Sequence, residues 1–328
     1  MTVHRAFAAP ALLRNPHLMT LTARYWPRGP LLAGIPTEAR FFRVTPDTQL
    51  LGFCHWQPDK TGHKTVVLVH GLEGSSDSHY MRGIATKAYT FGMNVIRLNQ
   101  RNCGGTEHLT PTLYNSGLGQ DFRKVVDELA SSDGLERIWL VGYSMGGNLV
   151  LRTAGEAGTE QPALAGVVAV CPNIDPTRCV DALELPSNRI YHHHFLISMK
   201  GRMRRKSALY PGQWDLAALN DIRTLRLFDD LYTAKDGGYL NGADYYDRAG
   251  ARHVMGSIAV PTTIITAQDD PFIPYGMFES SVISHNPAIT LIAPRHGGHC
   301  GFLQSHANGE DRYWAENRIV ELIAGIRS

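Results

Sequence analysis

Six short apolar runs, rich in β-branched residues, constrain the fold of this chain more than any other feature. They occupy residues 65–70, 93–99, 137–142, 164–170, 262–267 and 289–294. Because polar residues do not alternate within them, the runs indicate strands that are buried on both faces of a sheet.

Segments in which apolar residues recur at helical spacing lie between several of these runs. The clearest are residues 78–92, 118–132 and 310–326. Alternation of strands and helices predicts an α/β fold with a mostly parallel central sheet flanked by helices. Two earlier segments, ARFFRV (39–44) and LLGFCHW (50–56), are expected to form an antiparallel hairpin at one edge of the sheet.

One connection is much longer than a parallel sheet requires. About ninety residues separate the run ending near Val170 from the run beginning near Thr262, where one helix and two short loops suffice. We therefore predict a core formed by residues 1–171 and 261–328, with an N-terminal arm over about 1–38. Residues 172–260 are expected to form an inserted, mainly helical cap.

Composition excludes several classes of protein. The formal net charge of the 328 residues is +2, which gives no strong field for nucleic acid. No apolar run approaches the roughly 18 residues that span a bilayer. The N-terminal apolar stretch AFAAPALL is interrupted by Pro10, which is not typical of a secretion signal. The five cysteines are odd in number and show no CxxC spacing. We expect free thiols and a cytoplasmic protein; oligomeric state stays open.

The stretch VGYSMGGN (141–148) is the first candidate for chemistry. Ser144 follows an expected strand and precedes an expected helix, with Gly142 and Gly146 two residues to either side. This strand–turn–helix context is that of a nucleophile elbow, in which backbones approach too closely for side chains at the glycine positions.

A serine nucleophile needs a histidine base that is oriented by a carboxylate. Asp269 and Asp270 follow one expected strand, and His296 and His299 lie in a glycine-rich loop after the next. The order serine, aspartate, histidine is the order of the α/β-hydrolase elbow enzymes, and all these residues fall at carboxyl ends of strands.

An ester carbonyl attacked by Ser144 becomes an oxyanion, which needs fixed N–H donors. We assign one donor to the backbone of Met145 and the other to the backbone of Leu72, in the loop HGLEGSS after the run 65–70. His70 is expected to organise this loop instead of acting as a second base.

Four stretches resemble one family: NPHLMTL (15–21), HGLEGSSDSHYMRG (70–83), LNQRNCGGT (98–106) and RHGGHCGF (295–302). Together with GYSMGGN, FDDLYTA and DYYDRA, they make the chain similar to the YheT-type α/β-hydrolases, relatives of the EMB8 plant proteins, over nearly its whole length. The resemblance implies a serine esterase with Ser144, Asp270 and His299 as the triad. Asp270 rather than Asp269 fits the Asp-x-x-x-Pro spacing to Pro274 common in such acid loops.

Three features of the sequence are open to a second interpretation. Asn102 stands where the family pattern suggests glycine, and asparagine tolerates left-handed geometry. The run HHH (192–194) is not expected to bind a metal, because consecutive side chains on a helix diverge. The basic run KGRMRRK (200–206) is interpreted as a solvated helix face, with a site for anionic lipid headgroups or a phosphate-bearing substrate as the alternative.

The sequence thus predicts a carboxylesterase-type serine hydrolase that acts on short- to medium-chain acyl esters without a cofactor or a metal. Acyl transfer to an alcohol, or action on an acylglycerol lipid, would use the same triad. A non-catalytic ligand-binding protein on the same fold is the alternative from another class. The expected partner is a small-molecule ester, with weak contact between the cap and a membrane surface.

Overall fold

The central sheet of this computed structural model, which describes residues 5–306 and 309–325, has eight strands in the order β1-β2-β4-β3-β5-β6-β7-β8. Strands β1 and β2 form an antiparallel hairpin, and β2 pairs antiparallel with β4, while all other pairs are parallel. The predicted α/β fold and its edge hairpin are confirmed. The strands are β1 (Glu38–Thr45), β2 (Thr48–His55), β3 (Thr65–Val69), β4 (Asn94–Leu98), β5 (Ile138–Tyr143), β6 (Leu164–Val170), β7 (Thr262–Ile265) and β8 (Ile289–Ile292).

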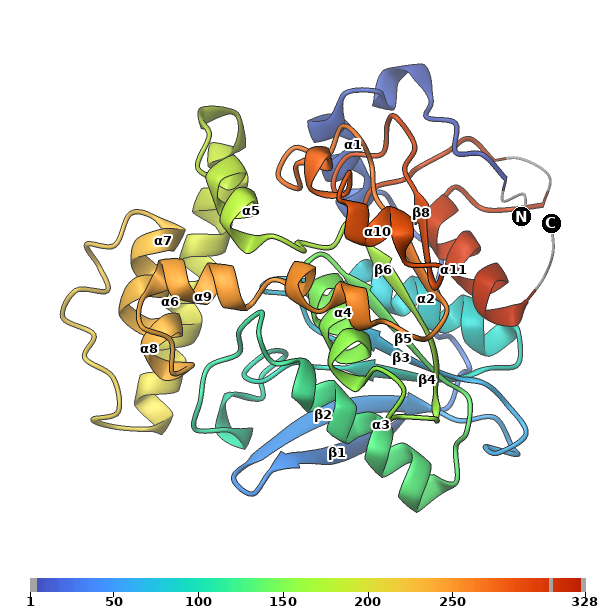
Figure 1. Cartoon of the computed structure of the whole chain (residues 1–328), viewed down its shortest axis with the longest axis horizontal. Coiled ribbons are helices and arrows are strands. Elements are labelled where there is room, and N and C mark those ends of the chain that lie inside the picture. Colours follow the sequence, from blue (N-terminus) through green and yellow to red (C-terminus); the bar gives the residue numbers. More distant parts are fainter. Residues whose placement is uncertain (1–4, 307–308, 326–328) are drawn as a thin grey trace.

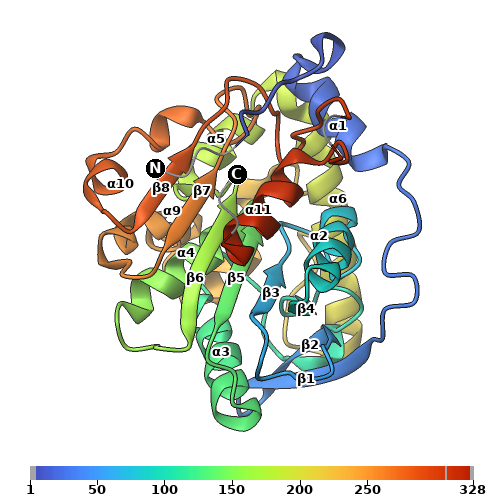
Figure 2. The ribbon, with the colours of Figure 1, turned by 90° about the vertical axis from the view of Figure 1, so that its right-hand side faces the viewer.

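Helices cover both faces of the sheet, which explains why every residue of β3 and β4 is buried. Helices α2 (His79–Thr90) and α11 (Trp314–Ala324) pack on one face, and α3 (Gly119–Asp133) and α4 (Met145–Ala157) pack on the other (Figure 2). The short helix α10 (Ser281–His285) precedes β8. Among the described residues, no helix is both long enough and apolar enough to cross a membrane.

The N-terminal arm contains a helix that the apolar pattern does not reveal, α1 (Pro16–Tyr25). The side chain of Asn15 accepts a hydrogen bond from the backbone N–H of Leu18 at 3.0 Å, and Pro16 occupies the first turn. Asparagine followed by proline is a helix-start signal. Met19 and Ala23 are the buried residues of this helix, so its apolar face is narrow.

The segment 172–260 lies between β6 and β7 and is called the insert below. It contains α5 (Pro176–Leu183), α6 (Arg189–Leu209), α7 (Leu225–Phe228), α8 (Ala234–Asp236) and α9 (Gly242–Arg248). Helices α6 to α9 lie to one side of the sheet (Figure 1). The division into core and cap stays a prediction.

The interpretation of the basic run as a solvated helix face is wrong for two of its residues. Arg202 and Lys206 are buried, whereas Arg204 and Arg205 are exposed. The ammonium group of Lys206 donates to the backbone carbonyls of Glu107 and Thr110. Burial lowers the pKa of Lys206 to about 8. Residues four apart on a helix share a face, and here that face meets the core.

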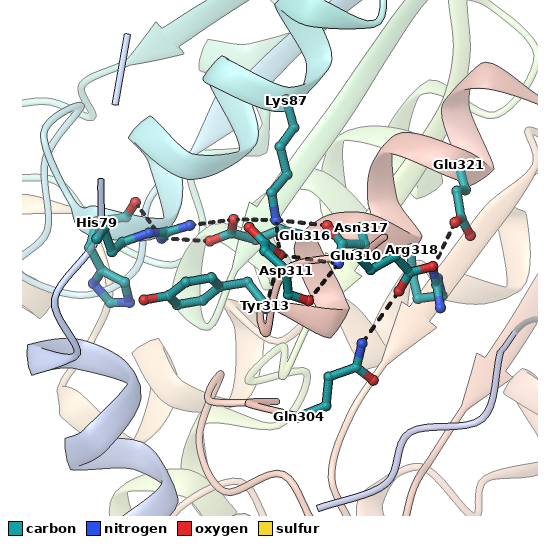
Figure 3. Close-up of polar contacts among 11 residues, drawn as sticks. His79, Lys87, Gln304, Glu310, Asp311, Tyr313, Glu316, Asn317, Arg318 and Glu321 are labelled. Carbon is teal, nitrogen blue, oxygen red and sulfur yellow. Dashed lines mark hydrogen bonds and ion pairs between the residues drawn. The ribbon is translucent and has the colours of Figure 1, made fainter. Parts of the chain in front are cut away.

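A buried charge network ties the N-terminal arm to α2 and α11 (Figure 3). Two nitrogens of the Arg28 guanidinium donate to the Glu316 carboxylate at 2.8 and 2.6 Å. The Lys87 ammonium lies 3.1 Å from Glu316 and 2.8 Å from Asp311. Glu316 is almost fully buried, so its charge depends on these two cations.

We expect Glu316→Ala to lower the free energy of unfolding by about 3–5 kcal/mol, because it leaves the charge of Arg28 buried without a partner. Chemical denaturation measures this loss. Glu160→Ala is the matched control: the Glu160 side chain is 77% exposed, so loss of its pair with Arg123 should cost at most about 1 kcal/mol. Equal losses in the two variants would contradict a structural role for the network.

Candidate functional site

Ser144 lies in a backbone conformation that few residues adopt. It joins the end of β5 to the start of α4 with φ 54° and ψ −118°. A Cβ atom at Gly142 would lie 2.1 Å from the carbonyl oxygen of Gly146, and one at Gly146 would lie 2.4 Å from the carbonyl oxygen of Val69. Only glycine fits at these two positions, so the turn lifts the serine off the end of the strand.

Each of the two adjacent aspartates contacts a different histidine. Asp270 accepts a hydrogen bond from His299 Nδ1 at 2.8 Å, and its other oxygen accepts from the backbone N–H groups of Phe272 and Ile273. The Asp270 side chain is fully buried and that of His299 nearly so. This carboxylate is held on both oxygens and fixes the orientation of one imidazole.

Asp269 braces the loop that carries these histidines. One of its oxygens lies 3.1 Å from His296 Nδ1, and the other accepts from the backbone N–H of Gly298 at 2.9 Å. The His296 side chain is 38% exposed, against 12% for His299. The two aspartate–histidine pairs therefore differ in burial.

A cavity of about 740 Å³ is lined by both Ser144 and His299, together with Gly71 and Leu72. His296 does not line it. A second cavity of about 80 Å³ adjoins Leu72 and Met145 and is lined by side chains of the insert that include the apolar Val180, Leu183, Met199 and Leu225 and the charged Arg202 and Asp229. Within the described residues no hydrogen bond joins Ser144 to His299; in free enzymes such bonds are often long and tighten with substrate.

The charge of Asp270 dominates the electrostatics of the pair. Burial alone would lower the pKa of His299, but the charge of Asp270, followed by the neighbouring Cys300, more than offsets this and raises the pKa of the imidazole above its ordinary value. Burial lowers the pKa of His70 to about 4, so this imidazole stays neutral. Its Nδ1 contacts the carbonyl of Gly71 and its Nε2 accepts the backbone N–H of Gln100, which holds the loop after β3 against the loop after β4.

The backbone N–H groups of Leu72 and Met145 have no hydrogen-bond acceptor in the described part of the chain. Met145 is the first residue of α4, where N–H groups have no partner within the helix and the helix dipole favours negative charge. Tyr80, to which the sequence argument gave no role, accepts the backbone N–H of Gly71 at 2.9 Å and stacks on Tyr143 with ring centroids 4.3 Å apart. Tyr80 lies in the HGLEGSSDSHYMRG stretch that carries the family resemblance, and this position is the sequence feature that could have identified it.

The N-terminal arm also contacts the histidine loop. The backbone N–H of His299 donates to Thr20 Oγ1 at 2.8 Å, and this hydroxyl donates in turn to the carbonyl of Pro16 at 2.7 Å. A Cβ atom at Gly301 would lie 2.7 Å from Cγ of the buried Met19. Helix α1 therefore helps to hold the loop that carries His299 in place.

Two thiols lie beside the imidazole. The possible ligand atoms of Cys171, His299 and Cys300 lie within 4.8 Å of one another. Among the described residues, these three side chains are the group that could hold a metal ion. His299 contacts Asp270 through Nδ1, so a metal ion here would bind Nε2, which is the nitrogen that a general base would use. That the protein needs neither metal nor cofactor stays a prediction.

The model of the α/β-hydrolase fold family matches residues 64–305, which include Ser144, Asp270 and His299. The chain belongs to the α/β-hydrolase fold family. It is 33% identical over 267 residues to the putative esterase YheT of Escherichia coli, covering 80% of this chain and 78% of that protein. The predicted resemblance to YheT-type hydrolases is confirmed.

Other similarities support a hydrolase without fixing a substrate. The mouse protein named phospholipase ABHD3 is 27% identical over 247 residues, which cover 75% of this chain and 60% of that protein. The crystal structure of a 2,6-dihydroxy-pseudo-oxynicotine hydrolase superposes with a TM-score of 0.61 at 17% identity and covers 95% of this chain and 73% of that one. This structural likeness supports the fold alone.

We expect Asp270→Asn to lower the pKa of His299, because the substitution removes the charge that holds the imidazolium. NMR titration of the imidazole measures this pKa, which in the parent should lie above the ordinary 6.5. Asp269→Asn is the matched control and should leave the pKa of His299 near its parent value. If His299 serves as a base, kcat/KM of the parent should fall as the pH drops through this pKa.

If His299 is the general base, Asp270→Asn should lower kcat on the order of 10⁴-fold, as the corresponding aspartate-to-asparagine change does in a serine protease. Asp269→Asn should cost far less. A crippled Asp269→Asn beside a nearly normal Asp270→Asn would show that the assignment is off by one residue.

Proposed function

We propose that the chain is a serine carboxylic-ester hydrolase that acts through an acyl-enzyme on Ser144. The observation that carries this proposal is that an elbow serine and a buried carboxylate–imidazole pair border one cavity. His299 would take the proton of Ser144 as general base and return it to the leaving alcohol as general acid. Asp270 would orient the imidazole and stabilise its protonated form.

The backbone N–H groups of Leu72 and Met145 would stabilise the oxyanion of the tetrahedral intermediate. Their lack of acceptors and the position of Met145 at the start of α4 support this role. Water that enters from the cavity would then attack the acyl-enzyme, with His299 again as base. No step in this sequence requires a cofactor or a metal ion.

The acyl group is the part of the substrate for which the site gives the most support. The small cavity beside the two N–H donors has apolar side chains of the insert along part of its lining, with the charged Arg202 and Asp229 also bordering it. The apolar part suits the chain of a short to medium acyl group. An alcohol that replaced water in the second step would make the protein an acyltransferase. Product analysis with added alcohol distinguishes the two reactions.

Hydrolysis of a lipid acyl ester is the second candidate, and the mouth of the large cavity favours it. Leu21, Tyr25 and Ile190 line this cavity and are also exposed, which gives its rim an apolar character. Such a rim suits weak contact with a membrane surface. The named phospholipase among the relatives points to the same class of substrate.

Ser144→Ala should abolish ester hydrolysis, with a loss in kcat of about 10⁶, and should abolish labelling by a fluorophosphonate probe. The substitution removes one hydroxyl, so thermal stability should change little. Ser281→Ala, at an exposed position, is the matched control and should keep both labelling and activity. A parent protein that the probe does not label would instead support a non-catalytic ligand-binding protein.

Medium-chain esters should be better substrates than acetate. Each buried methylene contributes about 0.8 kcal/mol, which corresponds to about a fourfold rise in kcat/KM until the pocket is full. A series of p-nitrophenyl esters of graded chain length measures this dependence. A rate that peaks at acetate and falls steadily with length would contradict an apolar acyl pocket formed by the insert.

A further inference from the structure

Glu73 follows the expected oxyanion donor Leu72 and has an unusual backbone and side-chain environment. Its φ of 55° lies in the left-handed region, which is unfavourable for a residue with a Cβ atom. Its side chain is only 7% exposed, although it carries a carboxylate. Neither feature is explained by the triad.

The carboxylate of Glu73 is held by three side chains from two separate segments. The Tyr114 hydroxyl donates to Oε1 at 2.8 Å, and the same hydroxyl accepts the backbone N–H of Glu73 at 3.0 Å. From the insert, the Ser198 hydroxyl donates to Oε2 at 2.6 Å, and Arg202 Nη1 lies 2.7 Å from Oε1. Both the backbone and the side chain of Glu73 are therefore fixed.

Arg202 forms an ion pair with Glu73 without ideal hydrogen-bond alignment. Its Nη1 and Nε satisfy no hydrogen-bond geometry among the described residues, although Nη1 is within contact of the carboxylate. The guanidinium also lies over the Tyr114 ring, 4.1 Å from the centroid. A buried guanidinium and a buried carboxylate 2.7 Å apart each compensate the charge of the other.

The helix face that holds Glu73 is the face that lines the large cavity. Ser198 and Arg202 are four residues apart on α6, and Tyr191 and Phe195 precede them at helical spacing. All four line the cavity together with Ser144 and His299. A substrate group that packs against this face of α6 therefore contacts the element that fixes Glu73.

We propose that Glu73 is a positioning residue that fixes the Leu72 N–H for the oxyanion and couples this geometry to the insert through Ser198 and Arg202. This inference rests on the proposed hydrolase function. Without these contacts the backbone at Glu73 is free to leave the left-handed region, which turns the loop and displaces the Leu72 N–H. The insert would then contribute to the rate of the chemical step as well as to substrate binding.

Glu73→Gln tests this proposal, because it preserves the shape of the side chain and removes its charge. We expect kcat to fall about 10²-fold with KM changed by less than about threefold, since a displaced donor is lost mainly in the transition state. The affinity for a trifluoromethyl ketone, which forms an oxyanion adduct with a serine, should weaken by a similar factor. Fluorophosphonate labelling of Ser144 should persist at a lower rate.

Ser198→Ala provides a second test that leaves no buried charge unpaired and so preserves folding. It should lower kcat in the parent but have no further effect in the Glu73→Gln background, as expected for residues that act through one contact. Ser207→Ala, on the same helix but outside the cavity lining, is the matched control.

Two results would overturn the proposal. One is a kcat within threefold of the parent in both Glu73→Gln and Ser198→Ala. The other is a loss of melting temperature with unchanged affinity for the ketone in both variants, which would indicate a purely structural contact. If the parent itself is not labelled by the fluorophosphonate probe, the proposed function fails instead.

Discussion

Close approach of three backbone segments at the end of β5 is the constraint on which the rest of the site depends. Gly146 lies so near the end of β3 that any Cβ atom would meet the carbonyls of Val69 and His70. A Cβ atom at Gly71 would likewise lie 3.1 Å from Cβ of Ser144. The serine, the loop after β3 and the start of α4 are thus held by backbone packing, which varies less than contacts between long side chains.

Much of this architecture could be predicted from the sequence because it follows from short-range patterns. The uninterrupted β-branched runs identify the buried strands, and glycines two residues to either side of Ser144 identify the tight turn. Asn102 illustrates the same logic: the sequence suggested a left-handed residue there, and its φ is 63°. The carboxyl-end positions of Asp270 and His299 were predictable for the same reason, since parallel strands all end at one rim.

Other features could not be predicted because their partners are distant in the chain. Nothing near Arg202 and Lys206 indicates that they are buried, since Arg202 pairs with Glu73 and Lys206 donates to carbonyls in the loop after β4. The identity of the histidine that each aspartate contacts is equally non-local. Spacing within a family favours Asp270, but only the folded loop shows that Asp269 contacts His296. Hydrophobic periodicity reports which residues avoid water, and it does not report how buried charges pair.

The contact between helix α1 and the histidine loop extends the structural support of the site beyond the residues that the family model matches. The family match begins at residue 64, yet His299 takes its backbone partner from Thr20, and Glu316 of α11 is neutralised by Arg28. The segment that the family model matches therefore leaves out residues that support the proposed site in this chain. A fragment trimmed to the matched residues would keep every residue of the proposed triad and lose the support that holds one of them in place.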